Sequence, residues 1–213
     1  MTQSADLILV LIILSNFVIL GTRELRVCIR TAAVQGALLS VLPLLVHREP
    51  GWRAILMVVG AALVKGIVVP GFLFRAIRDV KIRQEVNPYV GFIPSLFLCA
   101  VGSGLALLFA GSLPLAPEHA GSLLVPTSLA TILSGFLVLT TRRKAISQVV
   151  GYLMLENGIF IFGLLLIEAM PFLVEAGVLL DLFAGIFIMG IVLNHIQSEF
   201  SSLDTHLLSD LKD

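Results

Sequence analysis

Charged side chains are scarce in this sequence, and no part of it is polar enough to form a soluble domain. Only 13% of the 213 residues are charged, whereas 58% are hydrophobic and the mean hydropathy is +1.04. The longest polar stretch, the tail over residues 197–213, is too small to bury a core of its own. The sequence also lacks a basic patch interleaved with aromatic residues, which argues against nucleic-acid binding.

Cysteine is almost absent as well. Cys28 and Cys99 are the two cysteines of the chain, and they lie far apart without C-x-x-C spacing. Neither a disulfide nor a metal site is therefore expected, and both residues are interpreted as thiols in apolar surroundings. No glycine-rich phosphate loop and no cofactor fingerprint is present either. We expect no catalytic centre and no bound cofactor, so any redox chemistry that this chain serves would take place in a partner.

Long hydrophobic stretches occupy almost the whole chain. About 20 apolar residues in a helix cross the ~30 Å hydrocarbon core of a bilayer, and backbone groups inside lipid have to be paired within a helix. The N-terminus has neither the basic segment nor the cleavage site of a signal peptide, so the first stretch is predicted to be a span. The sequence thus predicts an all-α fold, a single membrane domain of about seven transmembrane helices. These spans are predicted over residues 4–22, 31–47, 54–74, 90–110, 122–141, 146–167 and 172–196.

Basic residues gather in alternate loops of this arrangement. Ten of them follow the first, third and fifth spans, whereas the loops of the other side hold only Arg48 and Arg53. Because basic loops stay in the cytoplasm, the pattern places the N-terminus outside and the C-terminal tail inside, in a multi-pass protein of the inner (cytoplasmic) membrane. The ten residues are Arg23, Arg26, Arg30, Arg75, Arg78, Lys81, Arg83, Arg142, Arg143 and Lys144.

Three spans carry an ionisable residue near their centre, namely Lys65, Glu156 and Asp181. A charge in hydrocarbon costs roughly 2.5–3.5 kcal/mol on insertion scales, and such residues usually mark a polar pathway. At about 1.5 Å per helical residue, all three lie near one mid-membrane plane. Burial disfavours the charged form of such groups and an opposite charge favours it, so a proton could be held here and easily moved. One interpretation is therefore a proton relay, and the other is a static ion pair that locks helices together.

Residues close to these charges extend both interpretations. Glu175, in the first turn of the last predicted span, could be the exit of a proton path or a solvated carboxylate favoured by a helix N-terminus. Asn157 follows Glu156 directly and could hydrogen-bond to another helix. Gly66 and Pro70 follow Lys65, and a proline inside a helix removes a backbone hydrogen bond and can kink it.

Four segments of the chain resemble the hydrogenase-4 component E family. Two of them follow closely on each other, QVVGYLMLENGIFIFGLLL and then PFLVEAGVLLDLF, and they contain Glu156 and Asp181. The other two are LVKGIVVP, around Lys65, and SSLDTHLLSDLK in the tail. The acidic and basic residues follow each other in the order and with the spacing of that family, and the resemblance extends over nearly the whole chain.

The resemblance implies a non-catalytic membrane subunit of a nickel–iron hydrogenase complex, such as formate hydrogenlyase, or of a related complex I-like assembly. Its partners would be other membrane subunits and the surrounding lipid, with indirect contact to a peripheral arm that holds iron–sulfur and nickel–iron centres. Residues 122–196 would be three helices similar to the K subunit of respiratory NADH dehydrogenase, and residues 1–110 would be four helices without a counterpart there. Residues 197–213 would be a cytoplasmic tail.

In the K subunit, two intramembrane glutamates support proton transfer. By that likeness Glu156 matches the first glutamate. Asp181 stands roughly where the second lies, one methylene shorter and closer in sequence. The proton-transfer residues suggested for this chain are thus Glu156, Asp181, Lys65 and Glu175. Two other functions stay open, a small membrane subunit of a multi-component cation/proton antiporter and a purely structural linker subunit.

Overall fold

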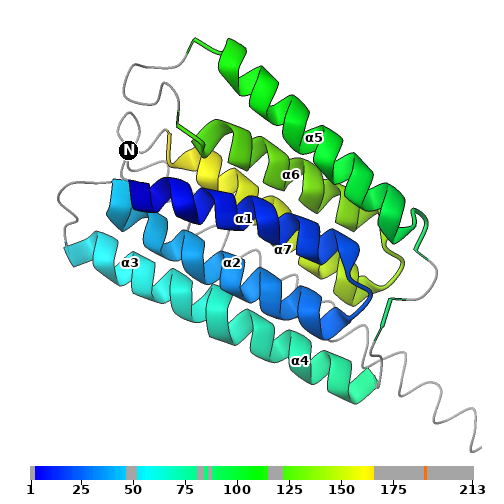
Figure 1. Cartoon of the computed structure of the whole chain (residues 1–213). Coiled ribbons are helices and arrows are strands. Elements are labelled where there is room, and N and C mark those ends of the chain that lie inside the picture. The colour runs from blue at the N-terminus through cyan, green and yellow to red at the C-terminus, as the bar shows by residue number, and fades with distance from the viewer. Residues whose placement is uncertain are drawn as a thin grey trace, which may run out of the picture.

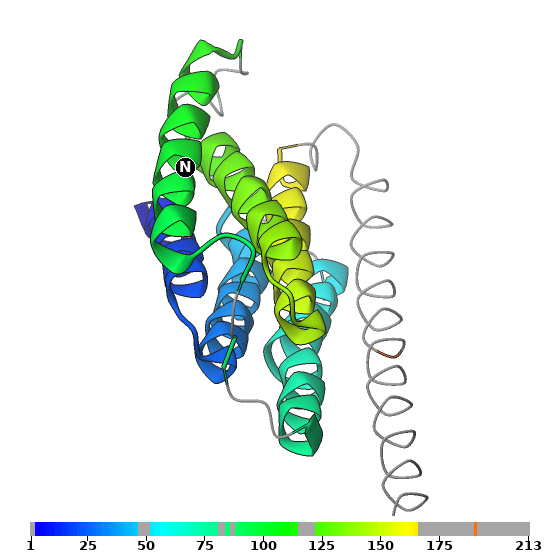
Figure 2. The ribbon, with the colours of Figure 1, turned by 90° about the vertical axis from the view of Figure 1, so that its right-hand side faces the viewer.

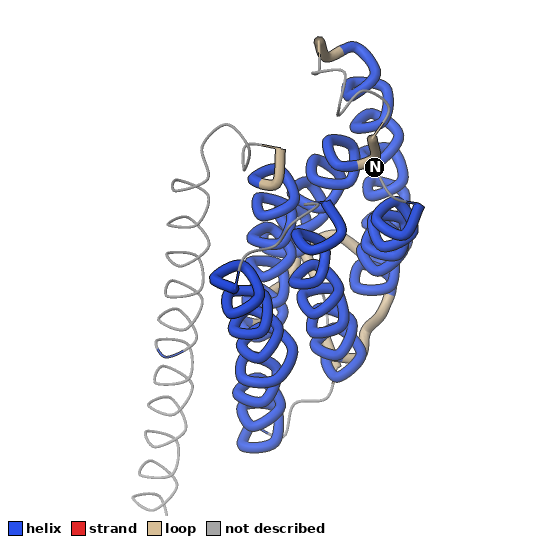
Figure 3. The backbone as a smooth tube through the Cα atoms, turned by 90° about the vertical axis from the view of Figure 1, so that its left-hand side faces the viewer, coloured by secondary structure: helices blue, strands red, loops and turns tan. Residues whose placement is uncertain are grey.

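Helices make up almost all of the described part of the protein. The computed structural model describes residues 3–46, 52–80, 84–85, 88–114, 122–165 and 190. Within these ranges no strand occurs, and an isolated antiparallel bridge joins Glu24 to Gln84. The tube drawing of Figure 3 shows the helices with their connecting loops. The helices are α1 (Gln3–Gly21), α2 (Leu25–Val46), α3 (Trp52–Leu63), the π-helical turn η1 (Val64–Val68), α4 (Val69–Val80), α5 (Phe92–Ser112), α6 (Leu124–Thr141) and α7 (Ala145–Gly163).

Six of these helical segments are long and apolar enough to cross a membrane, with α3, η1 and α4 forming one continuous span. The predicted all-α class is therefore confirmed for the described residues, and six of the predicted spans coincide with helices. The seventh predicted span, residues 172–196, lies outside the described residues together with Asp181 and Glu175.

Two helices extend beyond the predicted spans. Helix α2 begins at Leu25, so Arg26 and Arg30 lie in its first turns, and α4 continues to Val80, so Arg75 and Arg78 are helical. The prediction that these four arginines lie in loops is wrong. All four are exposed, and the apolar stem of an arginine can lie along a helix while its charge stays in the headgroup region. A prediction from hydrophobicity alone therefore makes these two helices too short, because it leaves out the turns that carry the arginines.

The helices run alternately up and down in one bundle. Figure 1 shows α5 along one edge and α3–α4 along the opposite edge, with α1, α2, α6 and α7 between them. Helices α6 and α7 share the most extensive contact, α5 packs on α6 and α1, and α3 packs on α2. The turned view of Figure 2 shows the crossing of α6 and α7.

Glycines bring α6 and α7 into direct backbone contact. A Cβ atom added at Gly151 would lie 2.6 Å from the backbone nitrogen of Leu139, and one added at Gly158 would lie 2.7 Å from that of Ile132. The Ser128 hydroxyl donates a hydrogen bond to the Gly158 carbonyl oxygen at 2.9 Å. Small residues at such contacts let membrane helices approach closely. This packing fixes the rotation of α7 and turns Glu156 and Asn157 into the bundle.

Replacing Gly151 by valine is expected to destabilise the protein, because the new side chain meets the backbone of α6, which cannot move aside as a flexible side chain could. Overpacking of this kind costs typically about 1–3 kcal/mol. Gly104→Val is the matched control, since nothing lies within 4 Å of a Cβ added there. Thermal unfolding in detergent should show a lower midpoint for Gly151→Val alone, and equal midpoints would contradict this packing.

Candidate functional site

A buried ion pair joins the third span to α7. The Nζ atom of Lys65, in η1, lies 3.1 Å from Oε1 of Glu156, and the side chains are 13% and 3% exposed. Lys65 Nζ also donates to Oδ1 of Asn157 at 3.4 Å, and it lies 5.6 Å from the centre of the Phe160 ring. The structure thus brings together two of the four suggested proton-transfer residues, and Asn157 joins them.

The backbone around Lys65 is suited to this contact. In the π turn the Val69 N–H bonds to the Val64 carbonyl oxygen, five residues back. Pro70 lies directly beyond and has no N–H to offer. On α2, a Cβ atom added at Gly36 would lie 2.9 Å from Cβ of Lys65, so the glycine makes room for the lysine stem. Single π turns inside α-helices occur frequently at functional sites.

Four more buried polar side chains continue from Lys65 across the bundle. Asn157 Nδ2 donates to Gln35 Oε1 at 3.3 Å, and Gln35 Nε2 donates to Asn16 Oδ1 at 2.8 Å. Asn16 Nδ2 then donates to Thr131 Oγ1 at 3.0 Å. These residues are between 0% and 2% exposed. Together with Lys65 and Glu156 we call them the polar layer, which connects the third span, α7, α2, α1 and α6.

The polar layer separates two hydrophobic clusters. Along α1, α2 and α7 the apolar side chains on one side of the layer belong to one cluster and those on the other side to the second cluster. Buried polar groups away from water are costly unless they are paired, and hydrogen bonds are strong in such surroundings. The first cluster includes Ile19, Leu20, Ile29, Ala32, Val138, Val150 and Met154, and the second includes Leu9, Ile12, Leu39, Leu42, Leu124 and Ile161.

The sequence interpretation missed Asn16, Gln35 and Thr131. Their signal is a neutral polar residue in the interior of a predicted span. It is weaker than that of a charge, because amides and hydroxyls are ordinary at contacts between membrane helices. Only the packing of the helices shows that these three residues extend the site of Lys65 and Glu156.

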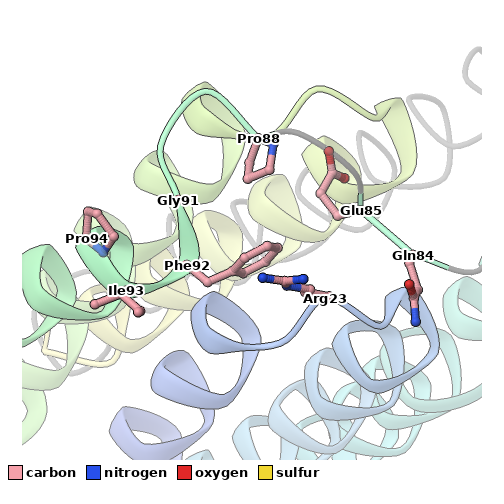
Figure 4. A pocket seen from close by; sticks show the side chains of 8 residues that line it. All are labelled: Arg23, Gln84, Glu85, Pro88, Gly91, Phe92, Ile93 and Pro94. Carbon is pink, nitrogen blue, oxygen red and sulfur yellow. The ribbon is translucent and has the colours of Figure 1, made fainter.

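A second group of polar residues lies at the end of the bundle where α5 begins. A pocket of about 600 Å³ is open there, and Figure 4 shows Arg23 beside Phe92 in its wall. Glu85, another buried acid that the sequence interpretation missed, accepts hydrogen bonds from the backbone N–H of Arg143 at 3.2 Å and from the Ser147 hydroxyl. The pocket is lined by Arg23, Gln84, Glu85, Pro88, Gly91, Phe92, Ile93 and Pro94.

Arg142 joins the ends of three helices at this end of the bundle. Its buried guanidinium donates to the Leu20 carbonyl oxygen at 2.7 Å and to that of Val90 at 3.3 Å, and it lies 4.5 Å from the centre of the Phe92 ring. Burial lowers the pKa of Arg142, and the negative charge of the nearby Glu85 carboxylate acts in the opposite direction. These contacts are structural, because they join the ends of α1 and α6 to the start of α5.

Arg142→Leu should lower the stability of the protein, because the buried carbonyl oxygen of Leu20 and the partly buried one of Val90 lose their charged donor. A hydrogen bond to a charged group contributes about 1.5–3 kcal/mol. The neighbouring Arg143 is the control, since its side chain is exposed and its backbone N–H still bonds Glu85 in Arg143→Leu. The midpoint of thermal unfolding in detergent measures the stability of both variants. If the midpoint of Arg142→Leu is no lower than that of Arg143→Leu, Arg142 does not stabilise this end of the bundle.

The fold and the polar layer define a class of protein, a multi-pass helical membrane protein with a buried ion pair at mid-height. Within the described residues, no group of three or more His, Cys, Asp or Glu side chains could hold a metal ion.

Comparison with known proteins gives the family. The chain is 33% identical to the uncharacterised protein Rv0085 of Mycobacterium tuberculosis over 207 residues, which cover 95% of this chain and 93% of that protein. It belongs to the family of Rv0085. It is also 27% identical to hydrogenase-4 component E of Escherichia coli K12 and of Shigella flexneri over 157 residues, 71% of this chain and 70% of each relative. No family model matches the chain, and no solved structure matches it significantly.

Proposed function

We propose that this chain is a non-catalytic membrane subunit of a redox-driven, ion-translocating complex of the hydrogenase type, and that Lys65 and Glu156 belong to its proton path. The observation that carries the proposal is the buried ion pair in a chain distantly similar to hydrogenase-4 component E. Its partners are other membrane subunits of such a complex, and its location is the cytoplasmic membrane.

The ion pair suits proton transfer because an acid and a base lie in direct contact with little exposure. Two charges removed from water lose several kcal/mol each in hydration, and their mutual attraction offsets this loss only with good geometry. If the proton moves from Lys65 Nζ to Glu156 Oε1, an N–H bond breaks, an O–H bond forms and both groups become neutral. A change of charge in a neighbouring subunit could shift this balance. The redox step of a partner would then drive the proton.

The path is proposed to continue into the predicted seventh span. Asp181 is the next acceptor, as the similarity to the K subunit suggests, and Glu175 is the exit toward the outer surface. The end of the bundle with Arg23, Arg142 and Arg143 is proposed to face the cytoplasm. Hydrogen bonds of Arg142 to Leu20 and Val90, and of Glu85 to the backbone of Arg23 and Arg143, gather these basic residues at one end of the bundle, which supports this orientation.

Glu156→Gln is expected to abolish most proton translocation while the complex still assembles, because the amide keeps the shape of the side chain but cannot take up the proton. Glu85→Gln is the control, a buried carboxylate outside the polar layer. Dye-based proton uptake by membrane vesicles that contain the complex measures translocation, and native gel electrophoresis measures assembly. Normal uptake with Glu156→Gln would rule out the path.

The double variant Lys65→Met/Glu156→Gln tests whether the ion pair is part of a proton path or only a static lock between helices. Removing one partner of a buried pair costs about 3–5 kcal/mol, because the other charge is left uncompensated, whereas removing both is often neutral. We expect Lys65→Met alone to be less stable than the double variant. We expect the double variant to regain stability without regaining proton uptake, and recovery of both together would identify the pair as a lock only.

A further inference from the structure

The hydrogen bonds of the polar layer all point the same way. From Lys65 through Asn157, Gln35 and Asn16 to Thr131, each residue donates to the next one. This chain of hydrogen bonds begins at the α3–α4 edge of the bundle and ends on α6. Helix α6 in turn packs on α5, which lies at the opposite edge (Figure 1).

The charge of Lys65 sets this direction. An ammonium group has three donors and no acceptor, so Asn157 has to present its carbonyl oxygen to Lys65. The NH₂ branch of Asn157 is then turned to Gln35, which must in turn present its own oxygen, and the same reasoning applies to Asn16. In the reverse direction the Asn157 NH₂ would face the ammonium, donor against donor. The charge thus sets the direction at Asn157, and a further hydrogen bond from Gln35 Nε2 to the Ile12 carbonyl oxygen at 3.5 Å favours the same direction at Gln35.

Burial makes the three amides turn together. An unsatisfied buried donor or acceptor costs about 1–3 kcal/mol. A reversed Asn157 or Gln35 would be mismatched on both sides, and a reversed Asn16 would be mismatched at Gln35, because the Thr131 hydroxyl can donate as well as accept. Hydrogen bonds in a chain also polarise one another where water is excluded. A neutral Lys65 amine can accept as well as donate, which removes the requirement for one direction.

We propose that Asn157, Gln35 and Asn16 are positioning residues that form a one-way relay and transmit the charge state of Lys65 to Thr131 on α6. What passes along the amides is the orientation of their hydrogen bonds and not a proton. Ser134 follows Thr131 by about one turn of α6, and its hydroxyl oxygen lies 3.4 Å from the Cys99 sulfur of α5. The relay therefore ends beside the contact of these two helices. A role of the relay in ion translocation rests on the proposed function, whereas the relay itself could exist without that function.

The side-chain amide signals of asparagine test the relay. The chain has four asparagines, so the full-length protein labelled with ¹⁵N-asparagine in lipid nanodiscs gives four NH₂ signals, with Asn87 as the reference. We expect Lys65→Met/Glu156→Gln to shift the Asn16 signal, although neither substituted residue is bonded to Asn16, and Lys65→Arg, which keeps a cationic donor, to leave it near its native position. In a Gln35→Met background the double substitution should no longer shift it.

Either of two results would overturn the relay. One is an Asn16 signal that does not respond to the loss of the charge, and the other is a signal that responds equally with and without Gln35. If Gln35→Met does not fold, Thr131→Val and Thr131→Ser probe the other end, and only valine, which removes the last acceptor, should move the Asn157 signal. Equal Asn157 signals in these two variants would also refute it. The spectra do not depend on translocation, so normal proton uptake with Glu156→Gln would leave this result standing.

Discussion

A largely buried polar layer fixes the register of the helices around it. Apolar clusters lie on both sides of the layer, so sliding α1, α2 or α7 by one turn would place an amide against hydrocarbon and an aliphatic side chain among the amides. The cost of an unpaired buried polar group opposes any such shift. The geometry between Lys65 and Glu156 is consequently maintained by the bundle as a whole and not by these two residues alone.

The two members of the ion pair come from unequal surroundings. Glu156 stands on α7, whose backbone touches that of α6, and these two helices are the most buried spans of the described residues. Lys65 extends from the third span, which is among the least buried ones. Packing therefore holds the acid rigidly, while the long lysine stem can adjust its position. A site that exchanges a proton benefits from one fixed group and one adaptable group.

The sequence predicted the helices and the charged centre because both have strong local signals. Long apolar stretches have to be helical in lipid, and a charge such as Lys65 or Glu156 stands out within them. Gln35 and Asn16 could not be assigned in this way, since a neutral amide in a span becomes informative only when a partner from another helix is known. Glu85 could not be recognised either, because an acid in a short loop is ordinarily solvated and only the packed loops bury it.

The π turn at Lys65 amounts to one additional residue inserted in the third span. Each α-helical residue turns the chain by about 100°, so one residue more or less redirects every side chain beyond that point by this angle. A version of the span without the bulge could not keep both of its halves seated on α2 while the amine reaches Glu156. The single-residue bulge thus lets the helix halves before and after Lys65 both face α2, whereas a regular helix would turn one of them away.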